Sequence, residues 1–231
     1  MSAIGLGRPR FRDQMRELER SMLEALDMSQ TQLERVLDAA ARRDLRLAEF
    51  VIADDERIDG RYLEVHQGVL SLLALQTPVA GDLRLVAAVL HVITNIERVG
   101  DQCANIARLL VRTTSDAPEE SEVMRRILDM GVLVSAELAQ ARLAFAERDV
   151  ALAESLESQD EEVDRLNREV FRLAVHAGEN RCLREWAIAM TLVARALERI
   201  GGGAVDIGEQ AIFVTTGDFR ELSSVIEDNP R

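Results

Sequence analysis

The sequence predicts an all-α protein built from two similar halves, each with three helices. Three observations support this prediction. The chain of 231 residues is rich in Ala, Leu, Glu and Arg, and only 3% of its residues are aromatic, which favours helices over strands. A polar segment containing Pro118 lies close to the midpoint of the chain. A stretch of the first half also recurs in the second half.

Composition and charge exclude several classes of protein. Apolar residues make up 47% of the chain, which is too many for a disordered protein. The net charge of −13 argues against direct nucleic-acid binding, which needs a basic surface. Two cysteines cannot form a disulfide scaffold, and no apolar run approaches the roughly 20 residues of a membrane-spanning helix. No apolar segment follows the arginines of residues 8–12, so we expect no secretory signal and a globular, cytoplasmic chain.

The internal repeat aligns residues 44–59 with residues 149–164 at an offset of 105, and seven of the sixteen positions are identical. Glu97-Arg98-Val99-Gly100 matches Glu198-Arg199-Ile200-Gly201 at an offset of 101. Because the two matches occur in the same order, they indicate a duplicated unit. The smaller second offset leads us to expect a longer loop at residues 76–81 in the first half.

We expect helices at residues 11–41, 44–76, 82–113, 119–148, 149–176 and 180–215. The first should end just before Asp44, whose side chain is suited to cap the second helix. The second should end at Thr77, because the residue before a proline disfavours helix. The third is apolar on most faces and should be the most buried helix of its half.

The second half repeats these signals. Pro118 is followed by two glutamates, as at the start of a helix. Asp149 is the counterpart of Asp44 and should cap the fifth helix. The Ala177-Gly178-Glu179-Asn180 segment should separate the fifth helix from the sixth.

Acidic residues recur four positions apart at equivalent places in the two halves. Asp55 and Asp59, Glu97 and Asp101, and Asp160 and Asp164 each share one face of a helix. Two carboxylates on one face repel each other unless a cation neutralises them. Carboxylate oxygens suit magnesium, calcium, manganese or iron, and a multinuclear site fits the repetition. A solvated acidic face that binds nothing is the alternative interpretation.

Three runs carry a resemblance to a known family. The first comprises Asp82-Leu83-Arg84 and Asn95-Ile96-Glu97-Arg98-Val99-Gly100-Asp101-Gln102-Cys103-Ala104-Asn105-Ile106. The second comprises Ala196-Leu197-Glu198-Arg199-Ile200-Gly201 and Asp206-Ile207-Gly208-Glu209, and the third is Thr216-Gly217-Asp218-Phe219-Arg220. The chain resembles the PhoU family of phosphate signalling regulators in the sequence of these runs, in the order of the runs along the chain, and in the length of the chain.

The resemblance implies two pseudo-symmetric three-helix bundles, here residues 1–115 and 116–231. It implies action by protein contact and not by catalysis. The expected partners are a phosphate-sensing histidine kinase and the ATPase subunit of a phosphate transporter, with negative regulation when phosphate is plentiful. A homodimer is left open.

The resemblance also implies iron or zinc, in a site that can be multinuclear. The first-bundle ligands would be Asp55, Asp59, Glu97 and Asp101. The second-bundle ligands would be Asp160, Asp164 and Glu198.

The chain departs from the family pattern in one place. The family has Asp-His after Glu-Arg-Ile-Gly, where this chain has Gly202-Gly203. Glycine within a helix costs about 1 kcal/mol relative to alanine, so the segment should be weakened as well as short of one ligand. We therefore expect the first bundle to hold metal more readily than the second, although Asp206 and Glu209 are candidate substitutes.

Two rival functions remain. The first is a carboxylate-bridged metalloenzyme or metal store in a helical bundle. Against it, the sequence lacks the Glu-x-x-His signature of di-iron bundles and any evident set of acid, base and nucleophile. The second is a structural helical adaptor whose acidic motifs bind nothing.

Overall fold

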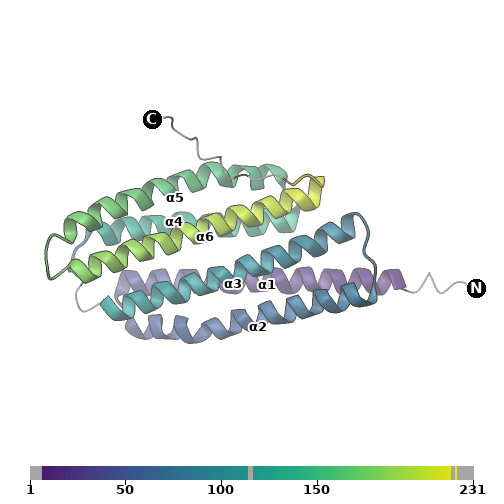
Figure 1. Cartoon of the computed structure of the whole chain (residues 1–231), viewed down its shortest axis with the longest axis horizontal. Coiled ribbons are helices and arrows are strands. Elements are labelled where there is room, and N and C mark those ends of the chain that lie inside the picture. The colour runs from purple at the N-terminus through teal and green to yellow at the C-terminus, as the bar shows by residue number, and fades with distance from the viewer. Residues whose placement is uncertain (1–6, 114–116, 220–221, 223–231) are drawn as a thin grey trace, which may run out of the picture.

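The computed structural model describes residues 7–113, 117–219 and 222, and its only regular elements within them are helices (Figure 1). The predicted domain boundary at 115/116 and Arg220 lie outside the described residues. The six helices are α1 (Gly7–Arg42), α2 (Leu45–Leu75), α3 (Gly81–Thr113), α4 (Glu122–Glu147), α5 (Val150–Ala177) and α6 (Arg184–Thr216). The all-α prediction is confirmed, and every helix begins and ends within four residues of its predicted bounds.

The same connection joins the first two helices of each half. Arg43 and Arg148 adopt left-handed backbone conformations with φ of 55° and 58°, and each ends its helix. The Asp44 carboxylate accepts hydrogen bonds from the backbone of Arg46 and Leu47, and the Asp149 carboxylate accepts one from Leu152. Both predicted caps are confirmed, and they fix equivalent helix pairs in the two halves.

The prediction of a longer loop in the first half is wrong. The loop spans residues 76–80 in the first half and residues 178–183 in the second. The offset changes instead because α2 has 31 residues and α5 has 28, and because α3 begins further ahead of Glu97 than α6 does of Glu198. Helix length absorbs the difference because α2 continues almost to Pro78, whereas α5 ends at Ala177, just before Gly178.

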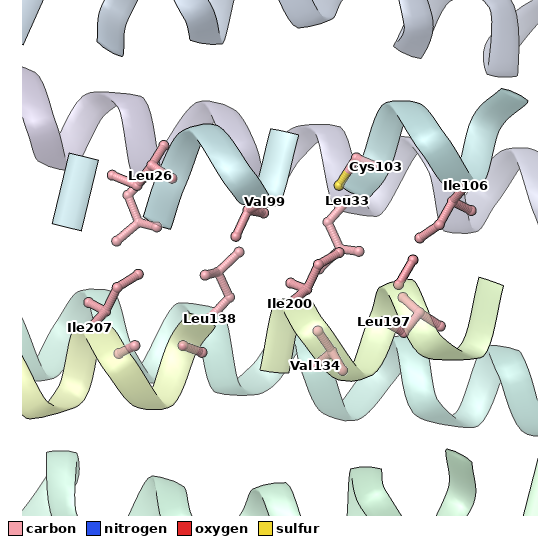
Figure 2. Packing of buried hydrophobic residues seen from close by; sticks show 14 of the residues in the cluster. Leu26, Leu33, Val99, Cys103, Ile106, Val134, Leu138, Leu197, Ile200 and Ile207 are labelled. Carbon is pink, nitrogen blue, oxygen red and sulfur yellow. The ribbon is translucent and has the colours of Figure 1, made fainter. Parts of the chain in front are cut away.

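The two bundles pack against each other along their length. Helices α1, α2 and α3 contact one another, as do α4, α5 and α6, and the halves meet through α1 against α4 and α3 against α6 (Figure 1). In Figure 2, buried side chains of α1 and α3 face those of α4 and α6. The labelled side chains are Leu26, Leu33, Val99, Cys103, Ile106, Val134, Leu138, Leu197, Ile200 and Ile207. The two halves therefore share one hydrophobic core.

The position of each helix follows from its apolar pattern. Val51, Ile58, Val65 and Leu72, spaced seven residues apart, are all buried and form the inner face of α2. As predicted, α3 is the most buried helix of its half, because it packs on α1 and α2 and makes the larger of the two contacts with the other half, against α6. None of the helices in the described part of the chain is long and apolar enough to cross a membrane.

Candidate functional site

The four predicted acidic residues of the first half come together between α2 and α3. Asp55 is buried, whereas Asp59 and Asp101 are exposed. Burial raises the pKa of Asp55 and of Glu97, and the nearby carboxylates of Asp59 and Asp101 raise both further. The carboxylates of the two sequence motifs therefore form a single acidic cluster in the structure.

A residue that the sequence motifs did not include completes this cluster. Gln32 of α1 is buried, and its side-chain amide donates a hydrogen bond of 3.2 Å to the Val51 carbonyl. The same amide makes a long contact of 3.5 Å with Asp55 Oδ1, which partly offsets the effect of burial on the pKa of Asp55. Asp55 thus has a neutral partner on a third helix.

The three predicted residues of the second half also lie together, between α5 and α6. Burial raises the pKa of Asp160 to about 6, and Asp164 and Glu198 contribute to the rise. Burial also raises the pKa of Glu198, against the opposing effect of Arg195, whose guanidinium lies 2.6 Å from the Glu198 carboxylate. The second half therefore forms an acidic cluster although it lacks the motif aspartate at position 202.

The second half has an additional carboxylate that sequence reasoning missed. Glu137 of α4 is only 1% exposed, and neither of its carboxylate oxygens has a hydrogen-bond partner among the described residues. Burial, with Asp160 and Asp164 nearby, raises its pKa to about 8. Two signals could have revealed it: Glu137 interrupts the apolar face formed by Val134 and Leu138, and it aligns with Gln32 at the repeat offset of 105.

The three consecutive glycines of α6 have different surroundings. A Cβ atom on Gly201 would lie 2.6 Å from Asp160 Oδ1 and 2.9 Å from Glu137 Oε2, so only glycine leaves both carboxylates in place. At Gly202, no atom of the described residues lies within 4 Å of such a Cβ, and at Gly203 the nearest is 3.8 Å away. Of the three positions, only the first is crowded, and a side chain there would displace the two carboxylates.

A cleft of about 380 Å³ opens beside the second cluster, where α3 of the first half meets α5 and α6. Its lining includes Arg98, Asp160, Asp164, Gly202 and Asp206. The cleft gives Asp160 contact with solvent on one side, while Gly201 and Glu137 lie on the other. It depends on the docking of the two halves, because α3 supplies one wall.

The two candidate substitutes for the missing aspartate have different environments. Asp206 lines the cleft, and burial raises its pKa against the opposing effects of His91 and Arg98 from α3. Glu209 is buried and accepts a hydrogen bond from the backbone of Leu222. Asp206 is therefore better placed than Glu209 to join the acidic cluster.

The acidic clusters fit a cation by their chemistry. The oxygens Glu137 Oε1, Glu137 Oε2 and Asp160 Oδ1 are buried without partners within the part of the chain that is described. Buried carboxylates of this kind are stabilised by a cation or a proton. Within residues 7–113, 117–219 and 222, however, no three His, Cys, Asp or Glu side chains are placed so that they could together hold one ion. A cation held by fewer protein ligands, with water completing its shell, is compatible with both facts.

Comparison with known proteins identifies relatives over nearly the whole chain. The PhoU domain matches residues 22–110 and 127–211, one match in each half. A phosphate-specific transport system accessory protein PhoU homolog from Mycobacterium leprae is 31% identical over 94% of this chain and 98% of its own length. A homologue of the same name from Caulobacter vibrioides is 36% identical over 85% of each chain.

Solved structures show the same architecture. PhoU from Pseudomonas aeruginosa superposes with a TM-score of 0.85 at 26% identity, covering 90% of this chain and 100% of its own. The phosphate transport system regulatory protein PhoU from Streptococcus pneumoniae gives a TM-score of 0.84 at 24% identity, covering 91% and 99%. The latter likeness concerns the fold alone.

Proposed function

Because the chain belongs to the PhoU family, we propose that it regulates phosphate uptake and phosphate-responsive signalling by contact with other proteins. The observation that supports this most is the match of both halves to the PhoU domain, in relatives that are named accessory proteins of phosphate-specific transport. The proposed location is the cytoplasm, where the kinase and ATPase domains of such a system are accessible.

The proposed partners are a phosphate-sensing histidine kinase and the ATPase subunit of the phosphate transporter. The regulator restrains the kinase and modulates the transporter when phosphate is plentiful. A net charge of −13 favours docking on basic surfaces, because long-range attraction speeds association. The exposed carboxylates of the first acidic cluster, Asp59 and Asp101, are suitable contacts for this purpose.

The proposal includes bound metal, iron or zinc, at the two clusters. The first would use Asp55, Asp59, Glu97 and Asp101, and the second Asp160, Asp164 and Glu198. A bound cation would supply positive charge that neutralises the repulsion among these carboxylates. The first cluster has both motif aspartates, Asp59 and Asp101, whereas the second cluster lacks one of its two because Gly202 stands in that position.

Binding of the purified chain to the kinase and to the ATPase subunit tests the regulatory function. We expect capture of at least one partner, weakened by added salt because the attraction is electrostatic. Capture of neither would remove the proposal. Metal-dependent hydrolysis or oxygen consumption by the chain alone would instead favour a metalloenzyme.

Restoring the missing carboxylate tests the metal proposal. Gly202→Asp should fold normally, because nothing in the described structure lies within 4 Å of the new Cβ. It should raise the metal content of the purified protein, measured by elemental analysis, whereas the matched control Gly202→Asn should not. Equal metal content in the wild type and both variants would count against metal binding at this motif.

A further inference from the structure

We propose that Glu137 and Asp160 bind a hard divalent cation of the magnesium type, in the space that Gly201 leaves between α4, α5 and α6. This site lies deeper than the motif carboxylates and uses a residue outside the motifs. It rests on the proposed cation binding by the second cluster but adds a ligand from a third helix.

Glu137 is buried without a hydrogen-bond partner among the described residues. Its side chain is 1% exposed, and both oxygens lack a hydrogen-bond donor among the described residues. Asp160 Oδ1, on the neighbouring helix, is also buried and also lacks a hydrogen-bond partner among the described residues. Buried carboxylates without partners are strongly disfavoured, so the two side chains need a ligand that accepts their lone pairs.

The carboxylate oxygens of Glu137 and Asp160 converge on one point beside Gly201. Asp160 Oδ1 and Glu137 Oε2 lie 2.6 Å and 2.9 Å from the single point where a Cβ of residue 201 would stand. Any side chain at that position would collide with both carboxylates. The glycine therefore keeps open the space in front of two facing acceptors.

The cleft beside Asp160 gives an ion and its water ligands access to the pair. Asp160 lies both in this pair and in the lining of the 380 Å³ cleft, together with Asp164. Magnesium-type ions are commonly held by one or two carboxylates and keep several water ligands. Two protein carboxylates beside an open cleft meet that requirement, even though no three acidic side chains converge among the described residues.

The internal repeat places a different residue at the equivalent position of the first half. Gln32 occupies in the first half the position of Glu137 in the second, at an offset of 105. Its amide donates to the Val51 carbonyl and approaches Asp55, so the first half satisfies its buried aspartate with a neutral donor. The two halves thus stabilise equivalent carboxylates in different ways, by an amide in the first and by a cation in the second.

A reciprocal exchange tests the site on the full chain. Manganese(II) is the probe, and free manganese is followed by electron paramagnetic resonance during titration, with magnesium as competitor. Glu137→Gln, which copies the first half, should weaken binding of one manganese equivalent by roughly tenfold or more. Gln32→Glu should add an equivalent. Circular dichroism establishes that each variant is folded.

Several outcomes would overturn the site. One is a folded Glu137→Gln variant with unchanged manganese affinity, and another is a folded Gln32→Glu variant with no added equivalent. Asp101→Asn, in the first cluster, separates this inference from the wider proposal. If Asp101→Asn weakens binding and Glu137→Gln does not, the motif sites stand and the deep site fails. If neither variant changes binding, both fail.

Discussion

Glu137→Gln should stabilise the metal-free protein, and the gain should grow with pH. The Glu137 carboxyl has an ordinary pKa of 4.5, which burial in the fold raises to about 8. Between these values the unfolded chain releases the proton while the folded chain retains it. The unfolding free energy therefore falls as pH rises through this window and levels off above about pH 8.

The size of the effect follows from the pKa difference. One pKa unit corresponds to about 1.4 kcal/mol, so Glu137 alone lowers the unfolding free energy by on the order of 2–3 kcal/mol between pH 5 and pH 7. Glutamine does not titrate, so the variant should lack this part of the pH dependence. Asp160, whose pKa is raised from 3.8 to about 6, contributes its own loss at lower pH, between about pH 4 and pH 6, and the variant retains it.

Urea unfolding followed by circular dichroism, at several pH values and with a chelator present, measures the effect. The matched control is Glu147→Gln, which changes an exposed glutamate at the end of the same helix. The unfolding free energies of wild type and Glu137→Gln should diverge with rising pH, whereas the control should follow the wild type. Parallel curves for all three proteins would refute the assignment of Glu137 as a buried carboxyl without a partner.

Three further predictions concern stability and are measured by chemical unfolding. Gly202→Ala should raise the unfolding free energy by about 1 kcal/mol through helix propensity. The unfolding free energy of Gly201→Ala should be about 1–3 kcal/mol lower than that of Gly202→Ala, because the new Cβ collides with two carboxylates. Equal stability of the two variants would contradict this packing. Asp44→Ala and Asp149→Ala should each lower the unfolding free energy by about 1 kcal/mol, and the two losses should add because the caps are far apart. A loss in only one half would contradict the equivalence of the two caps. Ile200→Ala, in the core shared by the halves, should cost about 2–5 kcal/mol and leave a single transition; two separate transitions would show that the bundles unfold independently.

The sequence predicted the helices and their pairing because these depend on local signals. Asp44 and Asp149 are caps that act within one turn, and the seven-residue spacing of Val51 and Ile58 defines a buried face. The gathering of the motif carboxylates also followed, because residues four apart on a helix share a face. The repeat then placed equivalent residues of the two halves in equivalent positions.

Other features could not be predicted, because they depend on how helices pack on one another. Glu137 is marked in the sequence by its place in an apolar face and by its match with Gln32, but its position beside Asp160 depends on how α4 packs against α5 and α6. The distinct need for Gly201, as opposed to Gly202, depends on which side of α6 faces the carboxylates. The cleft requires α3 of the other half as a wall, and no periodicity within one helix reveals that contact.

The regulatory role is tested most directly by the affinity of the purified chain for the transporter ATPase subunit and the histidine kinase, measured at increasing salt concentration. We predict binding to at least one of them at low salt, with an affinity that falls as salt screens the acidic surface. No binding to either protein at low salt would contradict the proposed function.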